Sequence, residues 1–200
     1  SGWQNCVTPS CSGGNGTATT ALTEDTTTSR DGNSARFDLG GSTAYSNARW
    51  WNQIASTGWT TQHFAYDFYA YVSNANAPQA FEFDWAVVLK GERYYFGQQC
   101  DFKGSHLWRV WSNNTWTNTS RGCSVFGGTW NHFILHGEIT ADNRVHYQDV
   151  VINGTTYTFD LYATPSSWSG SNVTVYLQLD GDASQTPYSL RVDNFNFSSW

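Results

Sequence analysis

Apolar and polar side chains alternate with a period of two through most of this chain, and this alternation limits what it can fold into. Between residues 64 and 72, every second residue is Phe, Tyr, Ala or Val, while Asp67, Tyr69 and Tyr71 lie between them. Successive side chains of a β-strand point to opposite faces, so the segment predicts a strand with one face in a core. The same alternation recurs at 81–88, 130–140, 145–152, 156–161, 173–180 and 188–197.

Turn signals separate these segments at short intervals. Lys90-Gly91 precedes a returning strand at 93–100, and Asn153-Gly154 is the dipeptide most typical of a tight hairpin. The pattern gives nine or ten strands and predicts an all-β fold, a sandwich of two antiparallel sheets of the jelly-roll type. We expect an edge strand near 17–22, a loop at 113–120 and, at 46–55, the one segment that could form two helical turns.

Length and charge narrow the class of protein further. The 200 residues contain neither an internal repeat nor a dividing linker, so we expect one domain over residues 1–200. The net charge is −6, with only two lysines, and this excludes the basic face that nucleic acids and anionic membranes require. Only 13% of the residues are charged, about half the usual share. These features favour a neutral, hydroxyl-rich partner and a monomeric protein.

The four cysteines form two local pairs in the sequence. Cys6 and Cys11 are close together, and Cys100 and Cys123 bracket 22 residues rich in Trp, Ser, Asn and Thr. We predict disulfides within each pair, with the bracketed segment as a local loop, although other pairings are open to four cysteines. No spacing typical of a zinc site is present. Disulfides indicate an oxidising compartment, and we therefore expect a secreted, extracellular protein.

The strand at 81–88 carries the most informative side chains. Its aromatic residues share one face, so Glu82 and Asp84 must project together from the other, about 6.5–7 Å apart. Two carboxylates so placed repel each other unless a cation, a proton or a hydrogen-bonding ligand lies between them. One interpretation is a solvated sheet face neutralised by Arg93 or Arg109. The other is a ligand, proton-sharing or metal site.

An E-x-D strand in an aromatic, disulfide-bearing all-β chain of this size resembles the concanavalin A-like lectin and glucanase superfamily. In legume lectins such a strand supplies a Glu and an Asp to a manganese/calcium pair, completed by an Asp and a His five residues apart. The resemblance implies Glu82, Asp84, Asp101 and His106 as an analogous metal set, with calcium as the candidate ion and no other cofactor. This chain has a predicted hairpin where the lectins have a short metal-binding loop.

The laminarinase-like glycosidases of the same superfamily use E-x-D-x-x-E. Glu82 and Asp84 resemble the first two carboxylates, but Val87 occupies the third position. The pair that retaining glycosidases need is therefore incomplete along this strand. Glu138 or Asp180 would have to replace it from another strand.

His132, His136 and Glu138 lie on one predicted face of the segment at 130–140. A histidine beside Tyr and Gln side chains suits the base of a polysaccharide lyase, with Tyr69 or Tyr71 as proton donor. The alternative is a histidine held by hydrogen bonds under a loop.

Tryptophan is the last signal. Nine of the 11 Trp lie outside the most obvious core faces, and we expect roughly half of all 11 in the core. The nine are Trp3, Trp50, Trp51, Trp59, Trp108, Trp111, Trp116, Trp168 and Trp200. Sugar rings stack their C–H faces on such aromatics, and their hydroxyls pair with Asn, Gln, Asp and Arg.

The sequence thus predicts a secreted carbohydrate-binding, lectin-like domain that recognises a polysaccharide on the sheet face bearing Glu82 and Asp84. The expected ligand-binding residues are Tyr69, Tyr71, Glu82, Asp84, Gln98, Arg109, His132 and Gln178. The alternative is an endo-acting glycoside hydrolase or polysaccharide lyase with Glu82, Asp84 and His132 as catalytic residues. A structural or adhesive surface domain is a third class.

Overall fold

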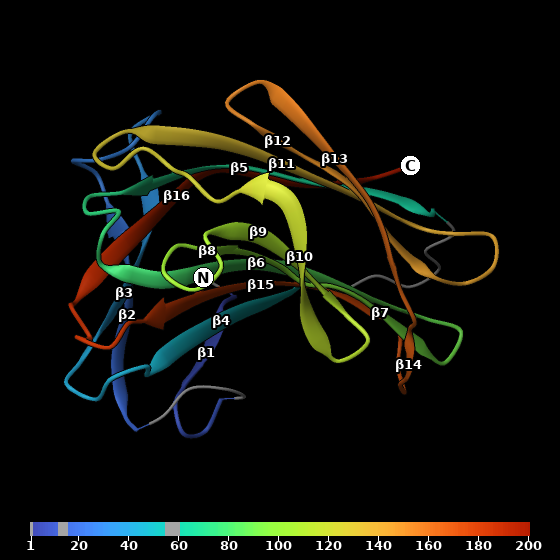
Figure 1. Ribbon diagram of the computed structural model, residues 1–200, viewed down its shortest axis with the longest axis horizontal. Coiled ribbons are helices and arrows are strands. Elements are labelled where there is room, and N and C mark those ends of the chain that lie inside the picture. The colour runs from blue at the N-terminus through green and yellow to red at the C-terminus, as the bar shows by residue number, and fades with distance from the viewer. Residues whose placement is uncertain (1, 12–15, 55–60) are drawn as a thin grey trace.

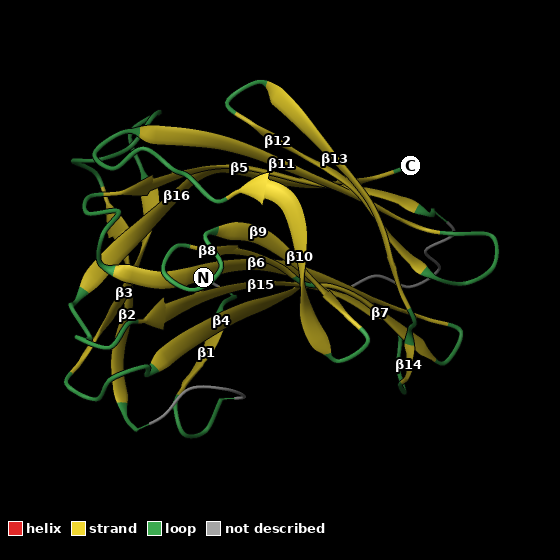
Figure 2. Cartoon of the chain, in the orientation of Figure 1, coloured by secondary structure: helices red, strands yellow, loops and turns green. Residues whose placement is uncertain are grey.

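Two antiparallel β-sheets pack face to face in the computed structural model, which describes residues 2–11, 16–54 and 61–200 (Figure 1). Within these residues one sheet has nine strands and the other seven, and loops join them without any helix (Figure 2). The nine-stranded sheet runs in the order β1 (Gln4–Val7), β4 (Asn47–Ile54), β15 (Asn172–Gly181), β6 (Pro78–Leu89), β8 (Gln98–Asp101), β9 (Leu107–Ser112), β10 (Thr115–Gly122), with β7 (Glu92–Phe96) on β6 and β14 (Ser166–Ser167) on β7. The seven-stranded sheet runs β13 (Thr155–Ala163), β12 (Val145–Ile152), β11 (Trp130–Ile139), β5 (His63–Val72), β16 (Tyr188–Ser199), β3 (Ser34–Gly41), β2 (Ala18–Asp25). The predicted two-sheet sandwich is confirmed.

Aromatic side chains from both sheets form the core. Phe68 of β5 packs against Phe83 of β6, with ring centroids 4.4 Å apart, and Phe133 of β11 lies 5.4 Å from Phe68 on the same sheet. Trp85 stacks on Phe96 at 4.6 Å. Burying one such ring contributes about 2–3 kcal/mol, so this layer is the main force that holds the sheets together. Each ring comes from the strand face that the alternation predicts.

Turn chemistry accounts for the hairpins. Lys90 and Gly91 both have positive φ, as do Asn153 and Gly154, and this is the conformation that a two-residue hairpin turn needs. Asn113 and Asn114 adopt it as well and join β9 to β10. The predictions of a loop at 113–120 and of a loop between Cys100 and Cys123 are therefore wrong. The polar residues Thr115–Gly122 form β10, which pairs with β9.

The helix candidate at 46–55 is also wrong. Residues Asn47–Ile54 form β4, between β1 and β15; residue 55 lies outside the described part of the chain. Ala48 and Trp50 enter the core and Arg49 points outward, a period-two pattern too short to stand out beside the adjacent Trp51. Pairing with two neighbouring strands decides the conformation here. The predicted edge strand near 17–22 is confirmed as β2.

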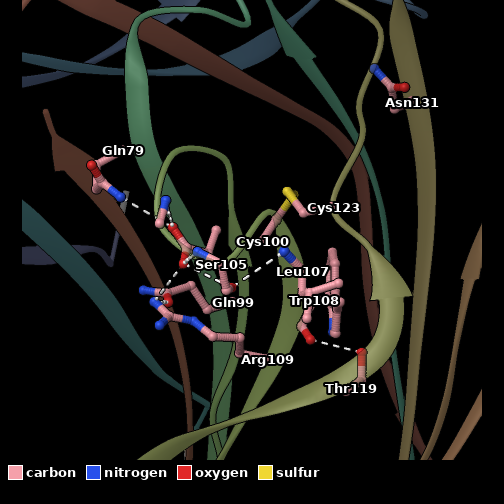
Figure 3. The surroundings of a disulfide bond; sticks show 12 residues. Gln79, Gln99, Cys100, Ser105, Leu107, Trp108, Arg109, Thr119, Cys123 and Asn131 are labelled. Carbon is pink, nitrogen blue, oxygen red and sulfur yellow. Dashed lines mark hydrogen bonds and ion pairs between the residues drawn. A yellow bond between two sulfur atoms is a disulfide. The ribbon is translucent and has the colours of Figure 1, made fainter.

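Both predicted disulfides form. Cys6–Cys11 closes the turn after β1, and Cys100–Cys123 joins β8 to the residue after β10. Figure 3 shows the second disulfide beside Trp108, whose side chain extends away from Arg109 of the same strand. This bond fixes the far end of β10 to the centre of the nine-stranded sheet.

Candidate functional site

Two hollows on the outer face of the nine-stranded sheet join to form a groove. They measure about 340 and 240 Å³ and share Glu82, Trp116 and Gln178 as lining residues. The larger hollow, the aromatic end, is lined in addition by Arg49, Arg93, Tyr95 and Trp111. The smaller hollow, the carboxylate end, is lined in addition mainly by Asn47, Gln99, Arg109 and Asp180. Larger hollows of about 430 and 480 Å³ along β2 and β3 lack both the buried carboxyls and the facing tryptophans, so we place the candidate site in the groove.

Asp84 lies at the base of the groove and is fully buried. Its carboxylate accepts hydrogen bonds from Arg49 Nη2 at 3.2 Å, Tyr95 Oη at 2.5 Å and the backbone N–H of Gln98 at 3.0 Å. Burial raises the pKa of Asp84, and the Arg49 charge and the Tyr95 hydroxyl act in the opposite direction. Burial and the Asp84 charge hold the pKa of Tyr95 well above its usual range, so Tyr95 stays a hydroxyl donor. The cation in direct contact with Asp84 is Arg49, while the charge of Arg93, one of the two expected arginines, acts on Asp84 from a longer distance.

Glu82 and Asp180 form a second carboxyl pair across β6 and β15. Gln99 Nε2 donates to both, at 2.9 Å to Glu82 Oε1 and 3.4 Å to Asp180 Oδ2. Burial and the nearby charges of Asp180 and Asp84 raise the pKa of Glu82 well above its usual range. Burial raises the pKa of Asp180 to about 6. Because each carboxyl accepts hydrogen bonds only from neutral amides, the pair releases its proton at a higher pH than ordinary carboxyls do.

Aromatic side chains form the walls of the groove. Trp111 of β9 and Trp116 of β10 are paired across the hairpin with ring centroids 5.3 Å apart, in an edge-to-face arrangement. Tyr95 lines the larger hollow as well, and its ring lies 6.0 Å from that of Tyr176. β10 is strongly curved (Figure 1), and its Trp116 lines both hollows. The combination of flat apolar walls with a few fixed polar groups is typical of small-molecule and glycan sites.

Three of the eight expected ligand-binding residues line the groove, namely Glu82, Arg109 and Gln178, and a fourth, Asp84, lies fully buried beneath Arg49 and Tyr95. Arg109 donates to Gln99 Oε1 and lies 3.4 Å from Asp101. Gln178 Nε2 donates to Asp180 Oδ1 at 2.9 Å. The polar side chains of the groove therefore hold one another in place.

The placement of the other four on the same face is wrong. Gln98 points into the core, where its Oε1 accepts a hydrogen bond from the Trp108 indole at 3.0 Å. Tyr69, Tyr71 and His132 lie on β5 and β11, in the seven-stranded sheet. His132 stacks on Tyr69 at 4.2 Å and pairs with Asp67 at 2.7 Å. The lyase arrangement of His132 with Glu82 therefore does not form.

The lectin-like metal set is not assembled either. Asp101 accepts hydrogen bonds from the backbone N–H groups of Gly104 and Ser105 and from the Ser105 hydroxyl. Burial raises the pKa of Asp101, but these donors more than offset it and hold that pKa below its usual range. His106 is exposed on the loop that follows. In the part of the chain that the structure describes, no group of three or more His, Cys, Asp or Glu side chains could hold a metal ion, and the oxygens of Asp84 already accept three protein donors.

The sequence pattern singles out Trp111 and Trp116 as candidate stacking residues but does not place them on the face of Glu82. Arg49 lies in the segment interpreted as helical, and Trp116 in the tract interpreted as a loop. Trp50 and Trp108, placed outside the core, are completely buried, whereas Trp59 lies outside the described residues. A signal for the pairing of Trp111 with Trp116 is Asn113-Asn114, which marks the turn between them.

No family model matches the sequence, and no curated protein matches it closely enough to report. Solved structures do match the fold. A cellulose-induced protein, Cip1, has a TM-score of 0.59 at 13% identity and covers 99% of this chain and 91% of its own. A carbohydrate-binding module of the β-sandwich superfamily has a TM-score of 0.53 at 9% identity. The match covers 98% of this chain but only 57% of the other.

An alginate lyase, Aly36B, has a TM-score of 0.53 at 11% identity and covers 84% of this chain and 81% of its own. The structural neighbours thus include a carbohydrate-binding module of the β-sandwich superfamily, a carbohydrate recognition domain and an alginate lyase. At these identities the likeness concerns the fold.

Among the described residues, no helix is long and apolar enough to cross a membrane.

Proposed function

We propose that the protein is a secreted carbohydrate-binding domain that holds a polysaccharide in the groove. The observation that carries this proposal is the pairing of Trp111 and Trp116 with buried, mutually fixed amide and guanidinium groups around Gln99 and Gln178. Sugar rings need both, because their C–H faces are apolar and their hydroxyls are hydrogen-bonding groups. The fold that the chain shares with a carbohydrate-binding module supports carbohydrate binding. The two disulfides support secretion, because they form in oxidising compartments.

Trp116→Ala tests the proposal. Pull-down against a panel of insoluble and soluble polysaccharides first identifies a ligand for the wild-type protein. Titration should then show a loss of affinity of about tenfold or more in Trp116→Ala, since one wall of the groove is removed. Trp200→Ala is the matched control, because Trp200 is 59% exposed and stacks on His63 of the other sheet. Equal affinities of both variants and wild type would refute the groove as the binding site.

An endo-acting glycoside hydrolase is the second candidate, and the Glu82–Asp180 pair favours it. A carboxyl group whose pKa is raised by burial and a neighbouring carboxylate suits a general acid at a glycosidic oxygen. Asp180 supplies the further carboxyl that position 87 lacks on β6. We favour binding, because Glu82 and Asp180 are hydrogen-bonded to each other and to the Gln99 amide, whereas the two carboxyls of a glycosidase stand about 5 Å or more apart on either side of the glycosidic bond.

Glu82→Gln separates the two candidates. In a binding groove the amide still pairs with hydroxyls, so the affinity should fall only modestly. In an enzyme the affinity should persist while turnover falls by about 10²-fold or more. Glu138→Gln, on the other sheet, is the control. Reducing ends or unsaturated products from wild type that disappear in Glu82→Gln would establish the enzyme and refute a pure binding function.

A further inference from the structure

Arg93 differs from the other arginines that line the groove. Arg49 is 3.2 Å from Asp84, and Arg109 is 3.4 Å from Asp101. Among the residues that the structure describes, no carboxylate lies within ion-pair distance of Arg93. The guanidinium has one protein hydrogen bond, from Nη2 to the Tyr176 hydroxyl at 3.3 Å. Most of its five N–H donors therefore remain for a ligand.

Aromatic side chains surround this guanidinium. It lies 4.6 Å from the centre of the Tyr95 ring and 5.2 Å from that of Trp168. Trp168 is held there because its backbone N–H donates to Gly91 and because the preceding strand β14 pairs with β7. Even so, 51% of the Trp168 surface is exposed. An exposed ring beside an unpaired cation offers a stacking surface for a sugar next to a donor for an anion.

We propose that the aromatic end of the groove is a subsite for a sugar carboxylate, so that the ligand is a polysaccharide containing uronic acid. This inference rests on the proposed polysaccharide-binding function and names its ligand class. The planar guanidinium of Arg93 matches a carboxylate with two parallel hydrogen bonds, and Trp168 receives the apolar face of the same or the adjacent sugar. The carboxylate end, with Glu82 and Asp180, accepts the hydroxyls of neighbouring residues of the polymer.

The charge distribution along the groove supports this orientation. Asp84 is in ion-pair contact with Arg49, and Arg109 with Asp101. Arg93 has no ion-pair partner among the described residues, and its charge acts on the buried Asp84 only from a longer distance. Asp180, which also has no ion-pair partner among these residues, lines the carboxylate end alone. A bound carboxylate is favoured beside Arg93 and disfavoured beside Asp180.

The test compares polymers that differ only in charge. Polygalacturonate, polyglucuronate and polymannuronate are each titrated beside their carboxyl-reduced, neutral forms, and a sulfated neutral glycan reports on anions other than carboxylates. Wild type should bind at least one uronate polymer tenfold or more tightly than its reduced form. Arg93→Gln should lose most of that preference, and Arg93→Lys should retain part of it, because a lysine keeps the charge without the planar fork.

Arg30→Gln is the matched control. The Arg30 guanidinium also lies over a tyrosine ring without an ion-pair partner among the described residues, but it comes from the loop between β2 and β3 and covers Tyr69 of the seven-stranded sheet. Thermal unfolding of each variant reports whether the fold is retained. Binding of neutral and uronate polymers with equal affinity would overturn the subsite and leave the polysaccharide-binding function standing. An uronate preference that persists in Arg93→Gln, or an equal Arg93-dependent preference for the sulfated glycan, would also overturn it. Binding of no polysaccharide at all would overturn both proposals.

Discussion

On the outer face of the nine-stranded sheet, the Asp84 side chain has no exposed surface, and its arginine partner keeps 17%. On the outer face of the seven-stranded sheet, Asp67 keeps 36% and its partner His132 keeps 27%. Both faces therefore pair carboxylates with cationic or neutral nitrogen groups. They differ in how much water reaches the pair, and this decides what the carboxylates can do.

The seven-stranded sheet pairs its histidines with carboxylates between adjacent strands. His132 contacts Asp67, His136 contacts Asp149, and His146 contacts Glu138, each at 2.7 Å. Such exposed cross-strand pairs contribute about 0.2–1 kcal/mol each to sheet pairing. In the groove, by contrast, Glu82 is buried and Asp180 half-buried, and their hydrogen-bond donors among the described residues are neutral amides. Burial raises the pKa of both carboxyls, although the charges of Arg49 and Arg109 act in the opposite direction. Carboxyls without a direct ion pair therefore distinguish the groove from the other face.

The largest expected effect compares the two arginines Arg49 and Arg36. Arg49→Ala leaves the Asp84 carboxylate buried without its cation, and we expect a loss of about 3–5 kcal/mol in the free energy of unfolding. Arg36→Ala removes the exposed partner of Asp38 on the seven-stranded sheet and should cost about 0–1 kcal/mol. Urea denaturation at neutral pH measures both.

Adding Asp84→Asn to Arg49→Ala should recover part of the loss, because the buried charge is then removed. Similar losses of unfolding free energy in Arg49→Ala and Arg36→Ala, or no recovery in the double variant, would contradict the prediction. They would show that ion pairs contribute equally to stability on the two faces.

The second prediction concerns the dependence of stability on pH. Burial raises the pKa of folded Asp180 to about 6, from 3.8 when unperturbed. Between these values the folded protein holds a proton that the unfolded chain has released. Stability should therefore fall as the pH rises from about 4 to about 6, by at most about 3 kcal/mol for this group. Glu82 acts in the same direction.

Asp180→Asn should flatten this slope. Asp25 on β2 of the seven-stranded sheet should change stability with pH in the opposite direction. Its pKa is lowered by Arg191, together with the Thr28 and Thr27 N–H groups. The stability that Asp25 contributes is present above its unfolded pKa and is lost as the pH falls. Denaturation midpoints are measured across pH for wild type, Asp180→Asn and Asp25→Asn. The difference between wild type and each variant gives the pH dependence that each carboxyl contributes. Contributions of the same sign would contradict the assignment of the groove carboxyls.

The face of each strand could be predicted from the sequence because alternation is a local property. The segments that became β5, β6 and β11 show their core side chains directly, and Glu82 and Asp84 were correctly placed opposite Phe83. The short strand β4 was missed, since two adjacent tryptophans obscured its alternation. The hairpin of β10 was missed because its strand is polar and largely exposed.

The sheet to which each strand belongs could not be predicted in the same way. β15 lies between β4 and β6, and β16 between β5 and β3, so the neighbours are far apart in the chain. Local patterns contain no information about such pairings. For this reason Tyr69 and His132 were assigned to the face of Glu82, and Arg49 and Trp116 were left out of it.

The smallest expected effect tests that reassignment directly. Tyr69→Ala and His132→Ala remove two rings that stack on each other at 4.2 Å on the seven-stranded sheet. Each should cost only about 0.2–1 kcal/mol of stability, because the pair is partly exposed and cross-strand. Neither residue lines the groove, so the affinity for a polysaccharide that Trp116→Ala weakens should stay within twofold of wild type. Titration of the three variants with one ligand compares the loss of an aromatic ring in the groove with the loss of one on the other face. If Tyr69→Ala or His132→Ala weakened binding fivefold or more while the fold was retained, the glycan would have to contact both outer faces, and the groove would no longer be a sufficient site.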